Sequence, residues 1–566
     1  MKSAAARVSE VNSYPQVLGK AVIVRALYEG RDISATWDAL MKRVSENLQD
    51  AGAFFDLANI LYTVRQPEKA ALSQKAAIEI SRTFHIRNGA GTGPTVLVFV
   101  VAGDFMANTP IEFLLEKSDA NILLHFVDGN TVDLSEVPEH DVAFIGIGES
   151  AENAEVLERL QHLLRGWRGP ILNNAPQRIA ALSRDAVAET FKDEPSILAP
   201  FTTRVPRDRL LSSNADLQRI GGISSWPIII RPVGTHAGGG LEKISSHAEL
   251  ESYLQGHGES EFYVAPFVDY SGPDGKFRKQ RIAFIDGKAY ASHLAVSDHW
   301  MVHYLSAGMA EHGDRRAEEA SWMADFDRDF AARHARAFDA LHRRLGLDYF
   351  AIDCAELPDG RLLLFEADVA MIVHAMDSEN VFPYKKLAMA RLFAGFEWAL
   401  RKRINRAGPI PTQRCAHTGK PAIYQRNDND CLICVIAMFA GRTYEEVQAI
   451  ARSCDPAFPL GGPMSHSIMR GVANKCGIVL LSSIYMLWAK PGIIGVISPT
   501  IPDAGHAVLW DGEKIIDPGN CERVDRGYVD RCGLEFTQRA RDLEPLIAHD
   551  DRISYVARAA MVGESN

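Results

Sequence analysis

The spacing of apolar residues changes three times along this chain of 566 residues. Between residue 16 and about residue 88 they recur every three or four positions, as in AFFDLANILYTVRQPEKAALSQKAAIEIS, with no β-rich run. This is the period of amphipathic helices. The break at Gln66-Pro67 predicts the start of a second helix, because proline is favoured in a first turn. We therefore expect a helical domain over residues 1–90, containing a helical hairpin.

From residue 94, short apolar runs alternate with helical stretches; the first three runs are PTVLVFVVAG, NILLHFVDG and HDVAFIGIG. Alternating strands and helices predict a parallel α/β layer, here over residues 91–200. After the first run, Thr109 is placed to cap a helix that begins at Pro110. Ligands favour the carboxyl ends of parallel strands, so Asn108 and Thr109 are either substrate contacts or a simple helix cap.

A glycine-rich loop joins two predicted strands in WPIIIRPVGTHAGGGLEKI, residues 226–244. The first strand ends in Arg231 and the second contains Lys243. Such loops fold over phosphates, because glycine lets backbone N–H groups come close while the basic residues supply charge. No Gly-Lys-Ser/Thr follows, so the loop does not match the P-loop pattern.

Two hairpins follow the strand-and-turn segment EFYVAPFVDY. The first, residues 277–295, begins with basic residues and turns at an Asp-Gly pair. The second, residues 345–374, turns at Pro-Asp-Gly, and its period-two alternation brings Asp353, Glu366 and Asp368 within reach of one another. Three carboxylates repel unless a cation joins them, and hard oxygen ligands facing a phosphate loop suggest Mg²⁺ on nucleotide phosphates.

This order of motifs resembles that of the ATP-grasp ligases over about residues 90–400. The resemblance implies two catalytic lobes over residues 201–404, with ATP between them and its adenine at a hinge over residues 264–269. It implies an acyl phosphate that an amine or similar nucleophile attacks, with Mg²⁺ on Asp353, Glu366 and Asp368. The residues that it assigns to the nucleotide are Arg231, Gly234, Gly238, Gly239, Gly240, Lys243, Val264, Phe267 and Asp269.

Two residues depart from the usual pattern of that family. Arg231 stands where Lys is usual, which keeps the charge and makes the contact bidentate. Asp368 stands where Asn is usual, which adds negative charge to the metal site. Neither change removes the chemistry.

The acceptor side is predicted by a segment with four histidines and a tryptophan, SHLAVSDHWMVHYLSAGMAEH, residues 292–312. Beside it, Arg278, Lys279 and Arg281 are placed to hold a substrate carboxylate or the developing phosphate. Of these, Arg281 is the firm candidate catalytic residue, because its strand should direct it at the nucleotide.

A new domain, residues 411–566, is expected after the Pro-Gly segment INRAGPIPTQ. In QRNDNDCLICVIAMFAGRTYEEV, Asp430 is placed to cap a helix that begins at Cys431. The N-terminus of a helix favours the thiolate form of a cysteine, so Cys431 is the candidate nucleophile. Cys434, one turn further, is expected in the core.

A base for this thiol is predicted in GHAVLWDGEKIIDPGN, residues 505–520, where a hairpin brings His506 beside Asp517. Gln425 is placed to donate a side-chain N–H to an oxyanion. The set resembles the papain-like cysteine peptidases, especially the bacterial branch that trims leader peptides, over about residues 420–535. The alternative is a packing helix beside an unrelated hairpin.

The composition of the chain limits the classes of partner and the cellular compartment that we expect. The net charge is −11 with no long basic stripe, which argues against nucleic acid. No signal peptide or membrane-length apolar run is recognisable, so we expect a cytoplasmic protein without a membrane contact. Eight cysteines in a reducing compartment are no disulfide framework. A zinc site from Cys415, His417, Cys431 and Cys434 matches no zinc spacing closely.

The sequence therefore predicts a multidomain α/β and α+β protein with an ATP-grasp fold and a C-terminal papain-like α+β domain. Its N-terminal domain is helical, and the hairpin there resembles one tetratricopeptide-type unit. The expected activity is ATP- and Mg²⁺-dependent ligation of a small-molecule or peptide carboxylate to an amine, fused to a cysteine peptidase or amidase. A peptide or protein partner at the helical N-terminus and a homodimer stay open. The alternative is a peptide-binding or maturation protein in which one catalytic unit is inactive and serves recognition.

Overall fold

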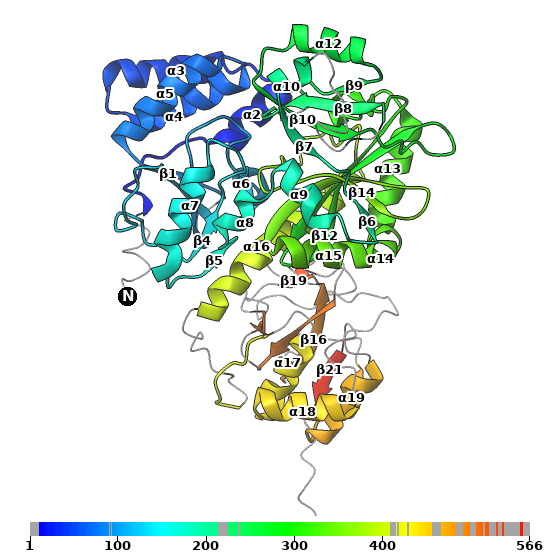
Figure 1. Cartoon of the computed structure of the whole chain (residues 1–566). Coiled ribbons are helices and arrows are strands. Elements are labelled where there is room, and N and C mark those ends of the chain that lie inside the picture. Colours follow the sequence, from blue (N-terminus) through cyan, green and yellow to red (C-terminus); the bar gives the residue numbers. More distant parts are fainter. Residues whose placement is uncertain are drawn as a thin grey trace, which may run out of the picture. The chain divides into compact units, whose positions relative to one another are not determined.

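The chain divides into two compact units, Met1–Ala407 and Gly408–Asn566 (Figure 1). The division falls within the Pro-Gly segment, most of which lies outside the described residues. The computed structural model describes residues 11–89, 91, 93–212, 223, 225–235, 238–407, 415, 418–426, 430–454, 466–482, 491–497, 505–512, 515–519, 528–529, 535–536 and 555–558.

The first unit begins with four helices: α2 (Lys20–Tyr28), α3 (Ser34–Glu46), α4 (Ala51–Thr63) and α5 (Pro67–Ile80). Helix α5 starts at Pro67, as predicted, and packs against α4 as a hairpin (Figure 1). The expectation of no strand before residue 88 is wrong, because Thr83–Arg87 forms strand β1. A run of five residues is too short for its period to be recognised in the sequence.

Strand β1 is the antiparallel edge of an otherwise parallel sheet with the order β1-β3-β2-β4-β5. The other strands are β2 (Thr95–Val100), β3 (Asn121–Phe126), β4 (Val142–Ile145) and β5 (Ile171–Leu172). Strands β2, β3 and β4 lie within the three predicted apolar runs. They are buried almost throughout, as expected when helices cover both faces of a parallel sheet. The helices of this layer are α6 (Ile111–Leu115), α7 (Ala154–Leu163), α8 (Pro176–Ala180) and α9 (Arg184–Phe191).

The loop after β2 differs from its prediction. Pro110, and not Thr109, precedes the first residue of α6, and no side chain caps this helix. The amide group of Asn108 bonds both the N–H and the carbonyl oxygen of Val101, at 2.8 and 2.7 Å. These bonds close the loop on itself, so Asn108 has a structural role here.

Two further sheets make up the rest of the first unit. The smaller sheet is antiparallel, with the order β7-β10-β8-β9, and α10 (Arg207–Leu211) and α12 (His247–Gly256) pack on it. Its strands are β7 (Thr203–Pro206), β8 (Ile228–Pro232), β9 (Glu242–Ile244) and β10 (Glu261–Pro266). Its interior is a separate hydrophobic core that includes Ile230, Leu254 and Phe262. We call this part the small lobe.

The larger sheet has the order β12-β11-β13-β14-β6 and is antiparallel except for β6. Its strands are β6 (Ile197–Leu198), β11 (Phe277–Ile285), β12 (Lys288–Ser297), β13 (Tyr349–Glu356) and β14 (Leu362–Asp368). Its helices are α13 (Gly313–Asp325), α14 (Phe330–Arg333), α15 (Ala335–Leu345) and α16 (Lys385–Ala407). Asp286 and Gly287 form the predicted turn, both with positive φ.

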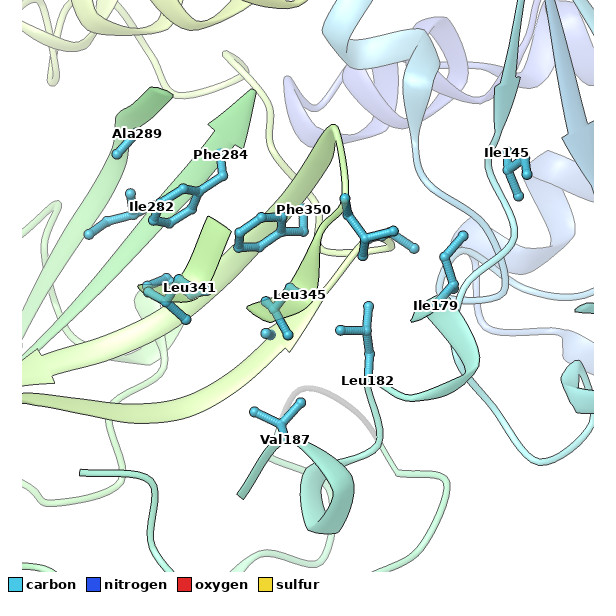
Figure 2. Packing of buried hydrophobic residues seen from close by; sticks show 14 of the residues in the cluster. Ile145, Ile179, Leu182, Val187, Ile282, Phe284, Ala289, Leu341, Leu345 and Phe350 are labelled. Carbon is cyan, nitrogen blue, oxygen red and sulfur yellow. The ribbon is translucent and has the colours of Figure 1, made fainter. Parts of the chain in front are cut away.

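The core of this unit joins the larger sheet to the α/β layer. Figure 2 shows Phe284 and Phe350 of the larger sheet in one cluster with Ile145 of β4. The rings of Phe284 and Phe350 stack with their centroids 4.6 Å apart. On α16, Phe396 contacts the rings of Phe144 in β4 and Tyr349 in β13, at 5.7 and 5.3 Å.

The second unit contains α17 (Cys431–Ala440), α18 (Tyr444–Cys454) and α19 (His466–Lys475). Helix α17 is apolar on almost every side and packs against the antiparallel sheet β16-β17-β18. The strands of this unit are β15 (Val479–Ser482), β16 (Gly492–Ile497), β17 (Gly505–Trp510), β18 (Ile515–Ile516), β19 (Tyr528–Val529), β20 (Glu535–Phe536) and β21 (Tyr555–Arg558). Among the described residues, no helix is long and apolar enough to cross a membrane.

The contact of Phe396 with both sheets can be tested by Phe396→Ala. Because this fully buried ring bridges two layers, we expect a loss of about 3–5 kcal/mol in the stability of the first unit. Leu387→Ala on the same helix, where the side chain is half exposed, is the matched control and should cost less than about 0.5 kcal/mol. Calorimetric unfolding measures both, and similar effects of the two variants would contradict this account of the core.

Candidate functional site

A cavity of about 570 Å³ lies between the small lobe and the larger sheet. Strands β8 and β10 form one wall, and β11, β13 and β14 form the other. Seven charged side chains line it: Arg184, Arg231, Lys279, Arg281, Asp353, Glu366 and Asp368. The cavity therefore brings cationic groups and carboxylates from several distant parts of the chain to one place.

Asp353 is the most deeply buried of these groups. Strand register places it opposite Arg281 on β11 and opposite Glu366 on β14. Arg281 bonds both of its carboxylate oxygens, at 2.8 and 3.0 Å, and Lys279 Nζ lies 2.7 Å from Oδ2. Burial alone would raise the pKa of Asp353, but the charges of Arg281 and Lys279 hold it well below its usual range.

The other two carboxylates differ from Asp353 in their partners. Glu366 is bonded by the guanidinium of Arg184. Asp368 accepts the backbone N–H of Ala370 at 3.0 Å, and burial, helped by the charge of Glu366, raises its pKa to about 7. An added cation at Asp368 would relieve this unfavourable burial of negative charge.

The predicted magnesium triad is only partly formed. Across the described part of the chain, no three His, Cys, Asp or Glu side chains are grouped as metal ligands. Both oxygens of Asp353 are taken by Arg281 and Lys279, which the sequence did not reveal. Glu366 and Asp368 fit a magnesium ion that draws its remaining ligands from a substrate, as Mg²⁺ commonly does with phosphates.

The zinc alternative receives no support from the three of its residues that are described. Cys434 and Cys415 are fully buried in the apolar core of the second unit, whereas Cys431 is half buried. The fourth residue, His417, lies outside the described residues.

The predicted nucleotide residues separate into two groups. Arg231, Gly238 and Phe267 line the cavity. Arg231 Nε donates to Thr235 Oγ1 at 3.3 Å, and burial, with the charge of Arg184, lowers its pKa to about 10. Outside the wall lie Gly234, Gly239, Gly240, Lys243, Val264 and Asp269.

The residues outside the wall have other contacts. Val264 is buried in the core of the small lobe, because alternate side chains of β10 face opposite sides. Lys243 Nζ lies 3.7 Å from the centre of the ring of Phe267, which itself lines the cavity. Asp269 accepts the N–H of Ser271. Gly240 has a φ of 63°, and a Cβ there would lie 2.6 Å from Pro232.

Two basic residues change the predicted picture of the site. Arg184, the first residue of α9, was not a candidate, although Ser183 directly before it is a residue type that favours a helix start. Arg278 was expected to hold substrate but is paired with Asp274 and Glu318 and does not line the cavity. Side chains alternate along β11, so Lys279 and Arg281 share the face turned away from Arg278.

A second constellation lies within the second unit. Cys431 begins α17 and is half buried, whereas Cys434 is fully buried, as predicted for this second cysteine. His506 Nε2 lies 2.7 Å from Asp517 Oδ1. Burial would lower the pKa of His506, but the charge of Asp517 and hydrogen bonds to Asp517 and Cys431 raise it to about 10. With Nε2 used by Asp517, the other ring nitrogen is the one available to the thiol.

Gln425 belongs to the same constellation. Its backbone N–H donates to the carbonyl oxygen of Pro518 at 2.7 Å. A Cβ placed on Gly519 would lie 3.1 Å from Asp517 Oδ1, 3.3 Å from Gln425 Oε1 and 3.7 Å from His506 Cε1. These three side chains therefore meet at Gly519.

Comparison with known proteins gives structural likenesses only. No family model and no curated protein matches the chain. D-alanine–D-alanine ligase from Bacillus anthracis complexed with ATP is similar at 13% identity and a TM-score of 0.35, covering 56% of this chain and 100% of that one. The corresponding ligase from Coxiella burnetii has 11% identity and a TM-score of 0.37, covering 56% of this chain and 96% of that one.

A RimK domain ATP-grasp protein from Sphaerobacter thermophilus is similar at 13% identity and a TM-score of 0.31, covering 53% of this chain and 98% of that one. All three TM-scores are below 0.5. The chemistry of the two sites has therefore to be argued from their own residues.

The pairing of His506 with Asp517 can be tested by Asp517→Asn. Loss of the negative charge should bring the pKa of His506 from about 10 toward its ordinary value of 6.5. Because the folded-state pKa is raised, the pair stabilises fully below about pH 6.5, and this stabilisation is lost as the pH rises through 10. NMR titration of ¹³C-labelled histidine measures the shift. An unchanged pKa in the variant would contradict the pairing.

Proposed function

We propose that the first unit is an ATP- and Mg²⁺-dependent ligase that joins a carboxylate to an amine. The observation that carries this proposal is the cavity wall, in which Arg184, Arg231, Lys279 and Arg281 converge with Glu366 and Asp368 between two β lobes. Four cationic groups against the carboxylates of Asp353, Glu366 and Asp368 give the wall a net positive charge, which suits a polyphosphate where water is scarce. The motif order that resembles the ATP-grasp ligases supports the same assignment.

Each wall has a separate role in this proposal. Arg231 and the loop at Gly238 bind phosphates, and the segment from Tyr263 to Val268 holds the adenine beside Phe267. Glu366 and Asp368 hold Mg²⁺, which neutralises charge on the phosphate oxygens. Tyr263, Val268 and Phe267 all line the cavity, which supports this placement.

Lys279 and Arg281 act on the reacting groups. The substrate carboxylate attacks the γ-phosphorus, and ADP leaves as an acyl phosphate forms. The amine then attacks the acyl carbon, the new C–N bond forms, and inorganic phosphate leaves. Lys279 and Arg281 stabilise the negative charge that develops on the transferred phosphoryl group.

The assay that tests this activity measures ADP release from Mg²⁺-ATP across a panel of carboxylates and amines. Hydroxylamine, added in place of the amine, converts an acyl phosphate to a hydroxamate that mass spectrometry identifies. A recognition protein with an inactive cavity would bind ATP without forming ADP or hydroxamate. Absence of ATP binding would overturn the proposal altogether.

Glu366→Gln should lower ADP formation by at least about a hundredfold, because one ligand fewer leaves Mg²⁺ poorly held. Glu356→Gln is the matched control, since Glu356 lies on the neighbouring strand, pairs with Arg333 and does not line the cavity. ADP release measures turnover, and circular dichroism checks the fold. Equal turnover of Glu366→Gln and the natural protein would contradict the metal assignment.

A second activity is favoured by the His506–Asp517 contact at 2.7 Å beside Cys431. We propose that the second unit is a cysteine peptidase or amidase. The thiolate of Cys431 attacks an amide carbonyl, the C–N bond breaks, and the amine leaves with the proton that His506 donates. Water then hydrolyses the thioester, and Gln425 donates to the oxyanion in both steps.

The two cysteines of α17 should differ sharply in reactivity. Cys431 should react with iodoacetamide at pH 7 at least about tenfold faster than an ordinary thiol, and His506→Ala should slow this reaction. Cys434 is the internal control and should stay unlabelled, since it is fully buried. Mass spectrometry of briefly alkylated protein reads both sites, and equal labelling would contradict the assignment. Cys431→Ala should leave ADP formation by the first unit unchanged.

A further inference from the structure

Asp430 directly precedes Cys431, and its side chain is fully buried. The sequence predicts that this carboxylate caps α17, but in the structure it makes no capping bond. Its Oδ2 atom accepts the hydroxyl of Tyr444 at 2.6 Å and the backbone N–H of Arg426 at 3.1 Å. The carboxylate is thus turned away from the first turn of its own helix.

The two partners of Asp430 come from different segments. Tyr444 is the buried first residue of α18, and Gln448 Nε2 donates to its hydroxyl at 3.2 Å. Arg426 directly follows Gln425, and its guanidinium lies 4.0 Å from the centre of the Tyr444 ring. Through these hydrogen bonds, the Asp430 carboxylate connects the segment that carries Gln425 to the starts of α17 and α18.

The same segment is fastened on its other side to the His-Asp hairpin. The N–H of Gln425 donates to the carbonyl oxygen of Pro518, and the N–H of Gly519 donates to Asp517 Oδ1, each at 2.7 Å. Hydrogen bonds at the neighbouring residues Arg426 and Gln425 therefore connect Asp430 and α18 on one side with the hairpin that carries Asp517 on the other. Gln425 is held from both sides.

The charge of Asp430 gives the thiolate no electrostatic help, since like charges repel. Within the part of the chain that the structure describes, the charged and titratable groups found around Cys431 are His506, Asp517, Asp430, Arg426 and Cys434. Among them, only His506 and Arg426 bring positive charge. A buried carboxylate in this place is therefore better explained by the geometry that it imposes than by its charge.

We propose that Asp430 and Tyr444 are positioning residues, whose hydrogen bond holds the Gln425 amide where it can donate to an acyl oxygen on Cys431. The inference rests on the proposed cysteine activity of the second unit. It assigns a function to two residues that touch neither the reacting atoms nor the substrate. Such bonds hold a donor in place before charge develops, which is when an oxyanion contact is effective.

The test uses two probes on the full-length protein. Iodoacetamide alkylates Cys431 by displacement and forms no oxyanion, so its rate reports the thiolate and His506 only. N-acetylglycinal adds the thiol to its carbonyl carbon and forms a thiohemiacetal, whose oxygen needs a donor. Its binding is measured as protection of Cys431 from iodoacetamide.

Tyr444→Phe removes the hydroxyl and keeps the ring. We expect it to weaken N-acetylglycinal binding about tenfold, as for one lost charge-assisted hydrogen bond, with the iodoacetamide rate within about twofold of the natural protein. Gln425→Ala should show the same loss, and the double variant no further loss, because both act through one contact. Asp430→Asn, which keeps an acceptor oxygen, should bind the aldehyde better than Asp430→Ala.

Glu445→Gln is the matched control, because it removes only the exposed partner of Arg426 and should change neither probe. If Cys431 of the natural protein reacts slowly and independently of His506, or the aldehyde gives no protection, the cysteine activity and this inference fall together. If both probes work but Tyr444→Phe binds the aldehyde normally, this inference alone is wrong. Equal losses with both probes in Tyr444→Phe would show a merely structural role and also overturn it.

Discussion

The first unit depends on one buried charge, that of Asp353 in the middle of the larger sheet. A carboxylate out of contact with water is tolerated only because Arg281 and Lys279 reach it from the neighbouring strand. Removing one partner from such a buried set costs about 3–5 kcal/mol, whereas a surface pair contributes little. A register shift of one residue would turn Arg281 to the other face of β11, so this ion pair and the pairing of β11 with β13 require each other.

The register that the Asp353–Arg281 ion pair requires also determines which side chains line the cavity. Once Asp353 and Arg281 fix the register, Glu366 lies opposite Asp353, and two residues further the strand presents Asp368 on the same face. The second unit uses a related device on a smaller scale, where the buried carboxylate of Asp517 holds His506. In both places a buried carboxylate decides where a cationic group can be.

Much of this arrangement was predictable from the sequence. The strands on both sides of the cavity follow from apolar runs and turn residues, and period-two alternation alone places Glu366 and Asp368 on one face. The sequence also predicts that His506 and Asp517 meet, although the pairing of Trp510 with Ile515 puts four residues, and not two, between these strands. These predictions succeeded because they concern residues that are close in sequence, where local geometry decides the outcome.

The predictions that failed concern residues that are far apart in the sequence or that have a competing partner in the folded chain. Arg184 meets Glu366 across 182 positions of sequence, and no local pattern announces such a contact. Asp430 was predicted as a helix cap, because a residue of this type before a helix usually bonds the N–H groups of the first turn. In the structure its carboxylate bonds Tyr444 of α18 and the backbone of Arg426 instead. The neutralisation of Asp353 by two cations was likewise invisible, since it depends on the pairing of β11 with β13, two strands far apart in the sequence.

The packing of helix α16 determines which parts of the first unit can move relative to one another. Phe396 and its neighbours fill one core with residues of β2 and β4 on one side and of β11 and β13 on the other. The α/β layer and the larger sheet thus share one hydrophobic core. Neither layer can rotate relative to the other without disrupting the packing of that core. The small lobe has an interior of its own and joins the rest through the segments before β7 and after β10. Opening and closing of the cavity is therefore expected as a hinge motion of the small lobe, with the remainder of the first unit as the fixed frame.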